Sequence, residues 1–233
     1  MIAFKNNKMS IKALQKYPAI FPEDALSHAK IVPHAEMALT LRDGIRNMGW
    51  VIHKEEFSLT KNNTIVSGVF YVEIPRRLSI PRSMYCLGFT HGFSRRLRLT
   101  IYMGLWSTAL SCGVVMDCVK GRRMSINLDL HKEAIRILDI YKERTKRIKV
   151  ENNLLYEAPP IETANVIPTL WRVAAEGAVN WSRMPIVIKE LGKDPVTPYS
   201  LYMACSKAIQ KSPDWYQLRE LHLAFKIIKK HAH

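Results

Sequence analysis

Hydrophobic residues recur at helical spacing in two long stretches of the chain. In residues 33–48, Leu41, Ile45 and Met48 fall on one face of a helix. Gly49 follows directly and suits the left-handed backbone conformation that commonly ends a helix. The pattern therefore predicts a helix over 33–48 whose apolar face packs against other elements.

The second long helix is predicted over residues 129–149, and it begins at a capping residue. The carboxylate of Asp129 can accept hydrogen bonds from the first backbone N–H groups of the helix. Cations crowd the end of this helix and complement its dipole, so part of the charge has a purely structural reason. An apolar stripe at helical spacing should pack on a sheet: Leu130, Ala134, Ile137, Leu138, Tyr141, Thr145 and Ile148.

Between the two helices, polar and apolar residues alternate in the manner of strands. Residues 51–59 and 65–74 flank a turn at 61–63 and predict a hairpin. A third strand is expected over 84–91. Residues 105–119 are almost continuously apolar, which fits either a central strand or a pair of strands with a bend at a glycine.

Residues 95–103 have the most informative alternation. One set of alternate residues is apolar: Leu97, Leu99, Ile101 and Met103. The other set offers two cations and an aromatic ring: Arg96, Arg98, Thr100 and Tyr102. Such groups suit phosphate contact and base stacking. The alternative is a solvated sheet face with ordinary surface arginines.

The remaining segments complete the fold prediction. Thr197 and Ser212 each precede a proline, which predicts two helix starts near the C-terminus. The predicted class is α+β, with a mostly antiparallel sheet of about five strands packed by two long helices. The expected divisions are an irregular N-terminal arm (1–30), an α+β core domain (31–150), a proline-containing linker (151–168) and a C-terminal helical segment packed on the core (169–233).

The charge balance narrows the class of partner. The 233 residues include 35 lysines and arginines against 20 aspartates and glutamates, a formal net charge of +15. This balance favours polyanions such as nucleic acid. No apolar run reaches the roughly 18 residues of a membrane span, and the N-terminus lacks the apolar region of a secretory signal. We therefore expect a cytoplasmic protein with reduced thiols and no membrane partner.

The predicted nucleic-acid contacts fall in three places. These are the cationic strand with the ring that follows it, the basic turn after the apolar segment, and the end of the second long helix. The cations would neutralise phosphates and the rings would stack on bases. The predicted contacts are Arg95, Arg96, Arg98, Tyr102, Trp106, Lys120, Arg122, Arg123, Arg144, Lys146 and Arg147.

Sequence motifs of enzymes are missing. The chain has no glycine-rich phosphate loop, no dinucleotide-binding fingerprint and no G-x-S-x-G elbow. The spacing of Cys112 and Cys118 is poor for zinc. A nucleophilic pair of His91 and Cys112 is conceivable, but a histidine satisfied in the core or in a turn is the favoured interpretation. We therefore predict no catalytic residue, no metal and no cofactor.

Four sequence blocks carry a resemblance to a known family. Two of them are IVPHAEMALTLRDGIRNMGW, continued by VIHKEEFSLTKNNTIVSGVFYVEI, and LGFTHGFSRRLRLTIYMG. The other two are ALSCGVVMDCVKGRRMSINLDLHKE and TPYSLYMACSKAIQKSPDWYQLRELHLAF. Together, over residues 31–228, they resemble the phage/plasmid-like family, the domain of unknown function numbered 932.

The chain departs from the pattern of that family at two places. The Ser-His-Asp-like turn of the family is Thr90-His91-Gly92 here, and no Asn-Gly follows Cys112. Only Thr90, His91 and Cys112 match, which disfavours an inherited catalytic role. The resemblance implies a mobile-element setting in a bacterial or archaeal host rather than a mechanism.

The sequence thus predicts a non-enzymatic nucleic-acid-binding protein of a phage or mobile element. Single-stranded DNA is the favoured ligand and RNA the alternative, with an accessory role in recombination, annealing or replication. A homo-oligomer fits this role by fold-level analogy. The competing hypothesis is an anti-defence protein that binds a host protein.

Overall fold

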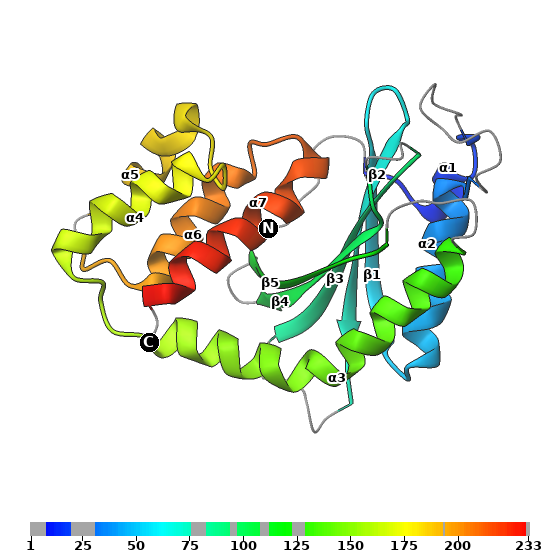
Figure 1. Ribbon diagram of the computed structural model, residues 1–233, viewed down its shortest axis with the longest axis horizontal. Helices are drawn as coiled ribbons and strands as arrows, with labels where there is room; N and C mark the ends of the chain where they lie inside the picture. The colour runs from blue at the N-terminus through cyan, green and yellow to red at the C-terminus, as the bar shows by residue number, and fades with distance from the viewer. Residues whose placement is uncertain are drawn as a thin grey trace.

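The computed structural model describes residues 8–19, 31–75, 83–93, 97–107, 112–122, 129–192 and 194–231. At its centre is a five-stranded antiparallel sheet whose strands follow one another in chain order (Figure 1). The α+β prediction is therefore confirmed. The strands are β1 (Val51–Leu59), β2 (Ile65–Glu73), β3 (Ser83–Gly92), β4 (Thr100–Ser107) and β5 (Cys112–Lys120).

Two long helices, α2 (His34–Asn47) and α3 (Leu130–Glu157), cover one face of the sheet. Helix α2 packs on β1 to β3, and α3 packs on β4 and β5. The two helices approach closely at Gly44, where an added Cβ would lie 2.5 Å from Leu138 Cδ1. Three packed aromatic rings fill the core under α2: Phe57, Phe70 and Phe89.

The sequence signals for these two helices are confirmed. Asp129 caps α3 by accepting hydrogen bonds from the backbone N–H groups of His131 (3.0 Å) and Lys132 (3.2 Å). Every residue of the apolar stripe predicted for α3 is buried. Gly49 follows α2 with φ +77°, the left-handed conformation expected there.

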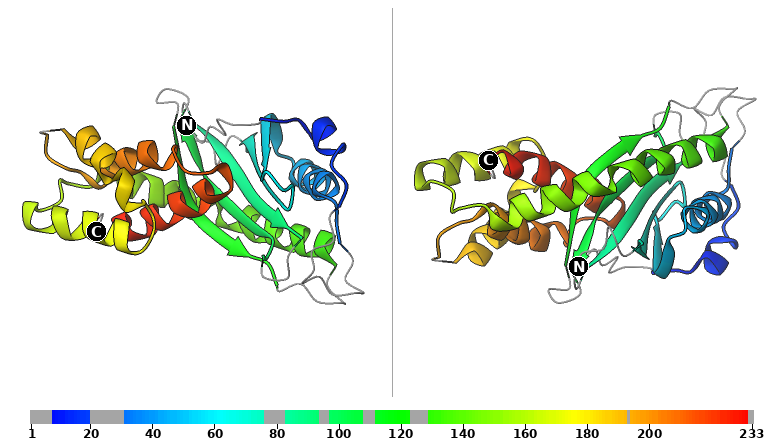
Figure 2. Two further views of the ribbon diagram at one scale, coloured as in Figure 1. Left: turned by 90° about the horizontal axis from the view of Figure 1, so that it is seen from above. Right: turned by 90° about the horizontal axis from the view of Figure 1, so that it is seen from below.

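The opposite face of the sheet is covered by α7 (Asp214–Ile228), which crosses the strands (Figure 2). At the start of α7, Asp214 Oδ2 accepts a hydrogen bond of 2.8 Å from Ser58 Oγ on β1. Leu218 sits over Gly88 of β3, where an added Cβ would lie 2.7 Å from Leu218 Cδ2. Glycine at position 88 therefore allows α7 to lie close to the sheet.

The other helices support α7 at the C-terminal end of the chain. Helix α6 (Pro198–Ile209) packs against both α5 (Met184–Leu191) and α7. It starts with the predicted cap at Thr197, and its Tyr202 Oη accepts a hydrogen bond of 3.1 Å from the backbone N–H of Val115 on β5. The short helices are α1 (Ile11–Leu14), η2 (Trp181–Arg183) and η3 (Lys229–His231).

The segment predicted as a linker, 151–168, is mostly helical. Helix α3 continues to Glu157 because Glu151 pairs with Arg147 of the same helix and Leu155 is buried. Helix α4 (Thr163–Ala175) then contains Pro168 in its interior. Only residues 158–162 are without helical structure. The proline content therefore marked a short break between two helices rather than an extended connection.

Three smaller expectations also change. Ser212 does not cap α7, since Pro213 occupies the N-cap position and the Ser212 hydroxyl instead contacts Arg183 and Glu220. Of the two alternatives for the apolar segment 105–119, the pair of strands is confirmed, but Gly113 lies within β5 instead of at a bend, and β5 is an edge of the sheet. The part of the N-terminal arm that the structure describes contains α1, which packs on α2.

Candidate functional site

A row of polar side chains crosses the sheet on the face that α7 covers. The strand register places Ser58, Ser67, Thr90, Thr100 and Lys120 opposite one another on β1 to β5. Directly paired residues of an antiparallel sheet point to the same side, so all five belong to one face. The four hydroxyl residues are buried and Lys120 is exposed. The row therefore ends in a cation at the edge of the sheet.

A pocket of about 880 Å³ lies between this row and α7. Thr90, Thr100 and Lys120 line it from the polar row, and Tyr102 and Cys118 line it from the next pair along β4 and β5. The side of α7 that faces these strands contributes a second wall: Tyr216, Arg219, His222, Leu223 and Lys226. A volume of this size is typical of a ligand site.

Four cations from three segments meet at this pocket. Arg98 comes from the chain just before β4, Lys120 from the end of β5, and Arg219 with Lys226 from α7. Among the described residues, no aspartate or glutamate lines the pocket. Within the described parts of the chain, none of these four cations forms an ion pair. Their charges therefore add up to a positive potential available to an anion.

A bulge in β5 keeps a carboxylate out of the pocket. Gly104 pairs with Val115, but the preceding Met103 pairs with Asp117, so β5 contains one extra residue, Met116. An extra residue inverts the alternation beyond it. Asp117 therefore lies on the α3 face, although it is separated from Val115, on the α7 face, by one residue.

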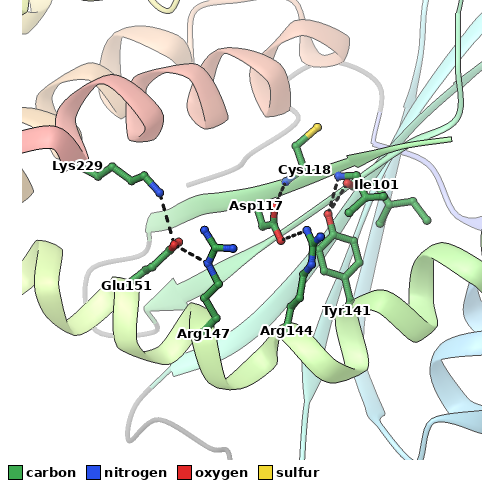
Figure 3. A network of polar contacts seen from close by, with 9 residues as sticks. Ile101, Asp117, Cys118, Tyr141, Arg144, Arg147, Glu151 and Lys229 are labelled. Atoms are coloured by element: carbon green, nitrogen blue, oxygen red, sulfur yellow. Dashed lines mark hydrogen bonds and ion pairs between the residues drawn. The ribbon is translucent and has the colours of Figure 1, made fainter.

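The close-up of β5 shows the result of this inversion. Cys118 points toward α7 and Asp117 points toward α3 (Figure 3). Asp117 Oδ2 accepts a hydrogen bond of 3.0 Å from Arg144 Nη1 on α3. One acid and one cation thus neutralise each other on the far side of the sheet, while Lys120 keeps its charge at the pocket.

His222 is the titratable group inside the basic pocket. Its ring lies edge-on to Tyr102, with ring centroids 6.4 Å apart. Its Nδ1 atom is buried and has no hydrogen-bond partner among the described residues. Burial lowers the pKa of His222; Asp117 acts in the opposite direction, and Lys226, Lys229 and Lys120 add to the lowering. The lowered pKa favours the neutral imidazole.

The other reactive groups of the pocket stay protonated at neutral pH. Burial raises the pKa of the Cys118 thiol to about 11, and it also raises the pKa of the Tyr102 hydroxyl. A protonated thiol is a poor nucleophile. The Cys118 thiol therefore lacks the thiolate character of a reactive cysteine.

The structure brings three of the predicted contact residues together: Arg98, Tyr102 and Lys120 all line the pocket. The expectation that Tyr102 stands on an open face is wrong. Helix α7 leaves only 6% of its surface exposed, and the neighbouring Thr100 only 8%. The regular strand also begins at Thr100 rather than at Arg95, so Arg98 belongs to the segment that leads into it.

The other predicted contacts lie elsewhere. Trp106 is half-buried near the far end of β4 and packs edge-on against Tyr71. Arg122 follows β5, 4.0 Å from the carboxylate of Glu133. Three more lie on α3, on the other side of the sheet: Arg144, paired with Asp117; Arg147, paired with Glu151; and the exposed Lys146. Arg95, Arg96 and Arg123 lie outside the described residues.

Sequence reasoning missed the contribution of α7. Arg219, His222 and Lys226 follow one another at intervals of three and four residues, which places them on one side of a helix. That spacing is a signal of a polar stripe. It could not reveal that the stripe faces the sheet, because the direction of α7 depends on folded contacts with distant residues, such as those at Ser58 and Gly88.

The predicted alternative of a His91–Cys112 pair is wrong. On β3, His91 lies beside Thr90, which pairs with the first residue of β4, whereas Cys112 pairs with Ser107 at the end of β4. Seven residues of strand separate these places, a distance of about 20 Å. His91 Nδ1 instead lies 3.0 Å from His34 Nδ1 on α2, in agreement with the interpretation as a core histidine.

Comparison with known proteins gives no assignment. No protein-family model matches the chain, and no curated protein or solved structure matches it. The resemblance to the phage/plasmid-like family therefore stays a prediction. Among the described helices, none combines the length and apolarity that a membrane span requires.

Proposed function

We propose that this protein binds single-stranded nucleic acid without catalysing a reaction, and that the basic pocket between the sheet and α7 holds its phosphates. The observation that carries the proposal is the meeting of Arg98, Lys120, Arg219 and Lys226 at a pocket whose described lining includes no acidic residue. Lysine and arginine side chains gain affinity for nucleic acid by releasing counterions from phosphates. The net charge of +15 adds long-range attraction.

The shape of the site favours a single strand over a duplex. Helix α7 forms one wall and the sheet forms the other, so the cations line a recess, with Lys120, Arg219 and Lys226 exposed to solvent. A single strand can bend its backbone into such a recess, whereas a duplex presents its phosphates on a stiff cylinder. Tyr216 is a half-buried ring in the lining and takes the stacking role first assigned to Tyr102.

The biological setting remains part of the proposal. A role in recombination, annealing or replication of a phage or mobile element rests on the sequence resemblance. The same resemblance is the reason for favouring DNA over RNA. The cations and the ring in the pocket suit either polymer and do not decide between them.

Fluorescence anisotropy with labelled single-stranded DNA, duplex DNA and single-stranded RNA, at two salt concentrations, tests the proposal. We expect salt-dependent binding with a preference for single strands, weakened about tenfold by Lys120→Glu. Lys189→Glu on α5 makes the same charge change at an exposed residue that does not line the pocket, and it serves as the control. Equal losses of affinity in Lys120→Glu and Lys189→Glu would contradict a role of the pocket in binding. Equal affinity for single strands and for duplex DNA would contradict it as well.

A second candidate function is binding to a host protein, and a different surface favours it. Trp171 on α4 and Trp181 in η2 are 61% and 55% exposed, with ring centroids 6.4 Å apart. Ile167, one turn before Trp171, is 75% exposed. Exposed aromatic rings of this kind are enriched at protein interfaces.

Affinity capture from nuclease-treated host lysate separates the two candidates. A stoichiometric protein that is captured by the wild type and lost with Trp171→Ser would favour the interaction protein. Capture of nucleic acid alone before nuclease treatment, with no protein retained afterwards, would count against it.

A further inference from the structure

We propose that the basic pocket recognises a phosphate monoester, as found at the end of a nucleic-acid strand or in a mononucleotide, and that His222 takes up a proton when this group binds. The inference rests on the proposed function and makes it more specific. It concerns which phosphate enters the pocket, whereas the proposed function requires only that nucleic acid binds.

The charge count of the pocket favours a monoester over a backbone phosphate. A phosphodiester carries one negative charge, whereas a phosphate monoester carries between one and a half and two near neutral pH. The part of the pocket that the structure describes offers Arg98, Lys120, Arg219 and Lys226 and no acid. The more highly charged group therefore neutralises more of the positive charge concentrated there.

The dimensions of the pocket also favour a phosphate monoester over a backbone phosphate. About 880 Å³ falls in the range of sites that enclose a small molecule, and it is bounded by β3 to β5 on one side and α7 on the other. A strand end or a mononucleotide can enter such a recess from one direction. A continuous strand has to enter and leave it, which leaves less of the pocket to any one phosphate.

His222 makes the occupied pocket sensitive to pH. The groups that face it are Tyr102 on β4, Cys118 and Lys120 on β5, and Arg219 and Lys226 on its own helix. Burial opposes a positive charge on the imidazole, and so do Lys226, Lys229 and Lys120, whereas Asp117 favours it; the net effect lowers the pKa of His222. A bound dianion offsets those lysines and favours the imidazolium, so binding and protonation reinforce each other by linkage.

Competition anisotropy with matched oligonucleotides tests the inference. Single strands of one sequence, with a 5′-phosphate, a 3′-phosphate or hydroxyls at both ends, are compared at pH 6.0, 7.0 and 8.0, with thymidine monophosphate as a separate competitor. We expect a strand with a terminal phosphate to bind about tenfold more tightly than the strand with hydroxyl ends at pH 6.0. We expect this preference to shrink as the pH rises, because His222 loses its proton.

The control for the proton is His222→Gln, which keeps a polar side chain that cannot titrate. Comparing it with the wild type at each pH cancels the titration of the phosphate itself, which also occurs near pH 6. A wild-type preference that falls with rising pH relative to the preference of His222→Gln at the same pH supports the role of the histidine. The same pH profile in both proteins overturns it.

The outcomes for the phosphate separate this inference from the proposed function. Equal affinity for phosphorylated and unphosphorylated strands at every pH overturns the monoester site and leaves nucleic-acid binding intact. Binding of thymidine monophosphate, measured directly by isothermal titration calorimetry, without binding of any strand supports the monoester site and overturns the proposed function. Failure of every ligand to bind overturns both.

Discussion

The two faces of the sheet differ in whether their cations form ion pairs. Under α3, cations are paired: Arg144 with Asp117 and Arg147 with Glu151 (Figure 3). Under α7, the cations Arg219 and Lys226 face Lys120 across a pocket that no described acidic residue lines. The two paired arginines of α3 therefore stabilise the fold, whereas the cations at the pocket add up to an unneutralised positive charge.

The bulge in β5 creates this difference between the two faces. A substitution that disrupts the bulge should therefore have the largest effect on stability. At Gly104, opposite the bulge, an added Cβ would lie 1.9 Å from the backbone oxygen of Val114. Backbone cannot move aside as a flexible side chain does, and Gly104→Ala should cost about 3 kcal/mol or more. Urea unfolding measures this cost.

Gly49→Ala is the control for Gly104→Ala. Nothing lies within 4 Å of a Cβ at Gly49, so only the strain of its positive φ is added, about 1 kcal/mol. If Gly104→Ala were no more destabilising than Gly49→Ala, the close approach at the bulge would not matter to the fold.

One tyrosine on each face of the sheet allows the contribution of a hydroxyl group to stability to be compared. On the α3 face, Tyr141 Oη donates to the backbone oxygen of Ile101 (2.6 Å) and accepts from the backbone N–H of Val119 (2.9 Å). Tyr141→Phe leaves two buried backbone groups without this partner and should cost about 2 kcal/mol, with nucleic-acid affinity unchanged. Tyr102→Phe, in the pocket, should change stability by less than about 0.5 kcal/mol. The free energy of unfolding of each variant measures these costs. A larger cost for Tyr102→Phe than for Tyr141→Phe would contradict the comparison.

The buried histidines of the α2 side give stability a pH dependence. Burial lowers the pKa of His34 to about 4 and that of His91 to about 3, below the ordinary value of 6.5. The native state therefore binds fewer protons than the unfolded state, and stability falls as the pH drops below 6.5. We expect a loss of about 1 kcal/mol per histidine between pH 7.5 and 5.5.

Urea unfolding of the wild type and of His91→Phe across this interval measures that loss. The variant lacks one of the two buried imidazoles, so its stability should depend less on pH. An equally steep profile in both proteins would show that other groups cause the loss.

Local signals predicted the helices and strands, because their causes lie within a few residues. The carboxylate of Asp129, the hydroxyl of Thr197 and the φ of Gly49 each act on the nearest backbone groups. The alternation in 51–59 and 65–74 gave the hairpin for the same reason. The five-stranded sheet follows from these elements when each strand pairs with the next.

The candidate site could be predicted only in part, because it depends on contacts between distant residues. Arg98 and Lys120 stood out as cations near the ends of strands, and both line the pocket. The second wall depends on α7, which is fixed by the contact of Ser58 with Asp214, 156 residues apart in the chain. The removal of Asp117 from the pocket depends on the bulge, which alternation alone cannot reveal.

The most direct test of the account compares matched charge reversals on the two helices. Arg219→Glu/Lys226→Glu changes α7 at the pocket, and Lys142→Glu/Lys146→Glu makes the same change in charge at exposed residues of α3. Each loses four units of positive charge. The measurement is the affinity for single-stranded DNA across a salt series, after circular dichroism has shown that both variants are folded.

The account predicts that the α7 variant binds about a hundredfold more weakly and that its salt slope falls by roughly 1.4, since two phosphate contacts are lost. The α3 variant should stay within about threefold of the wild type and keep its slope. An equal loss in both variants would contradict the account, because binding would then follow net charge rather than the pocket.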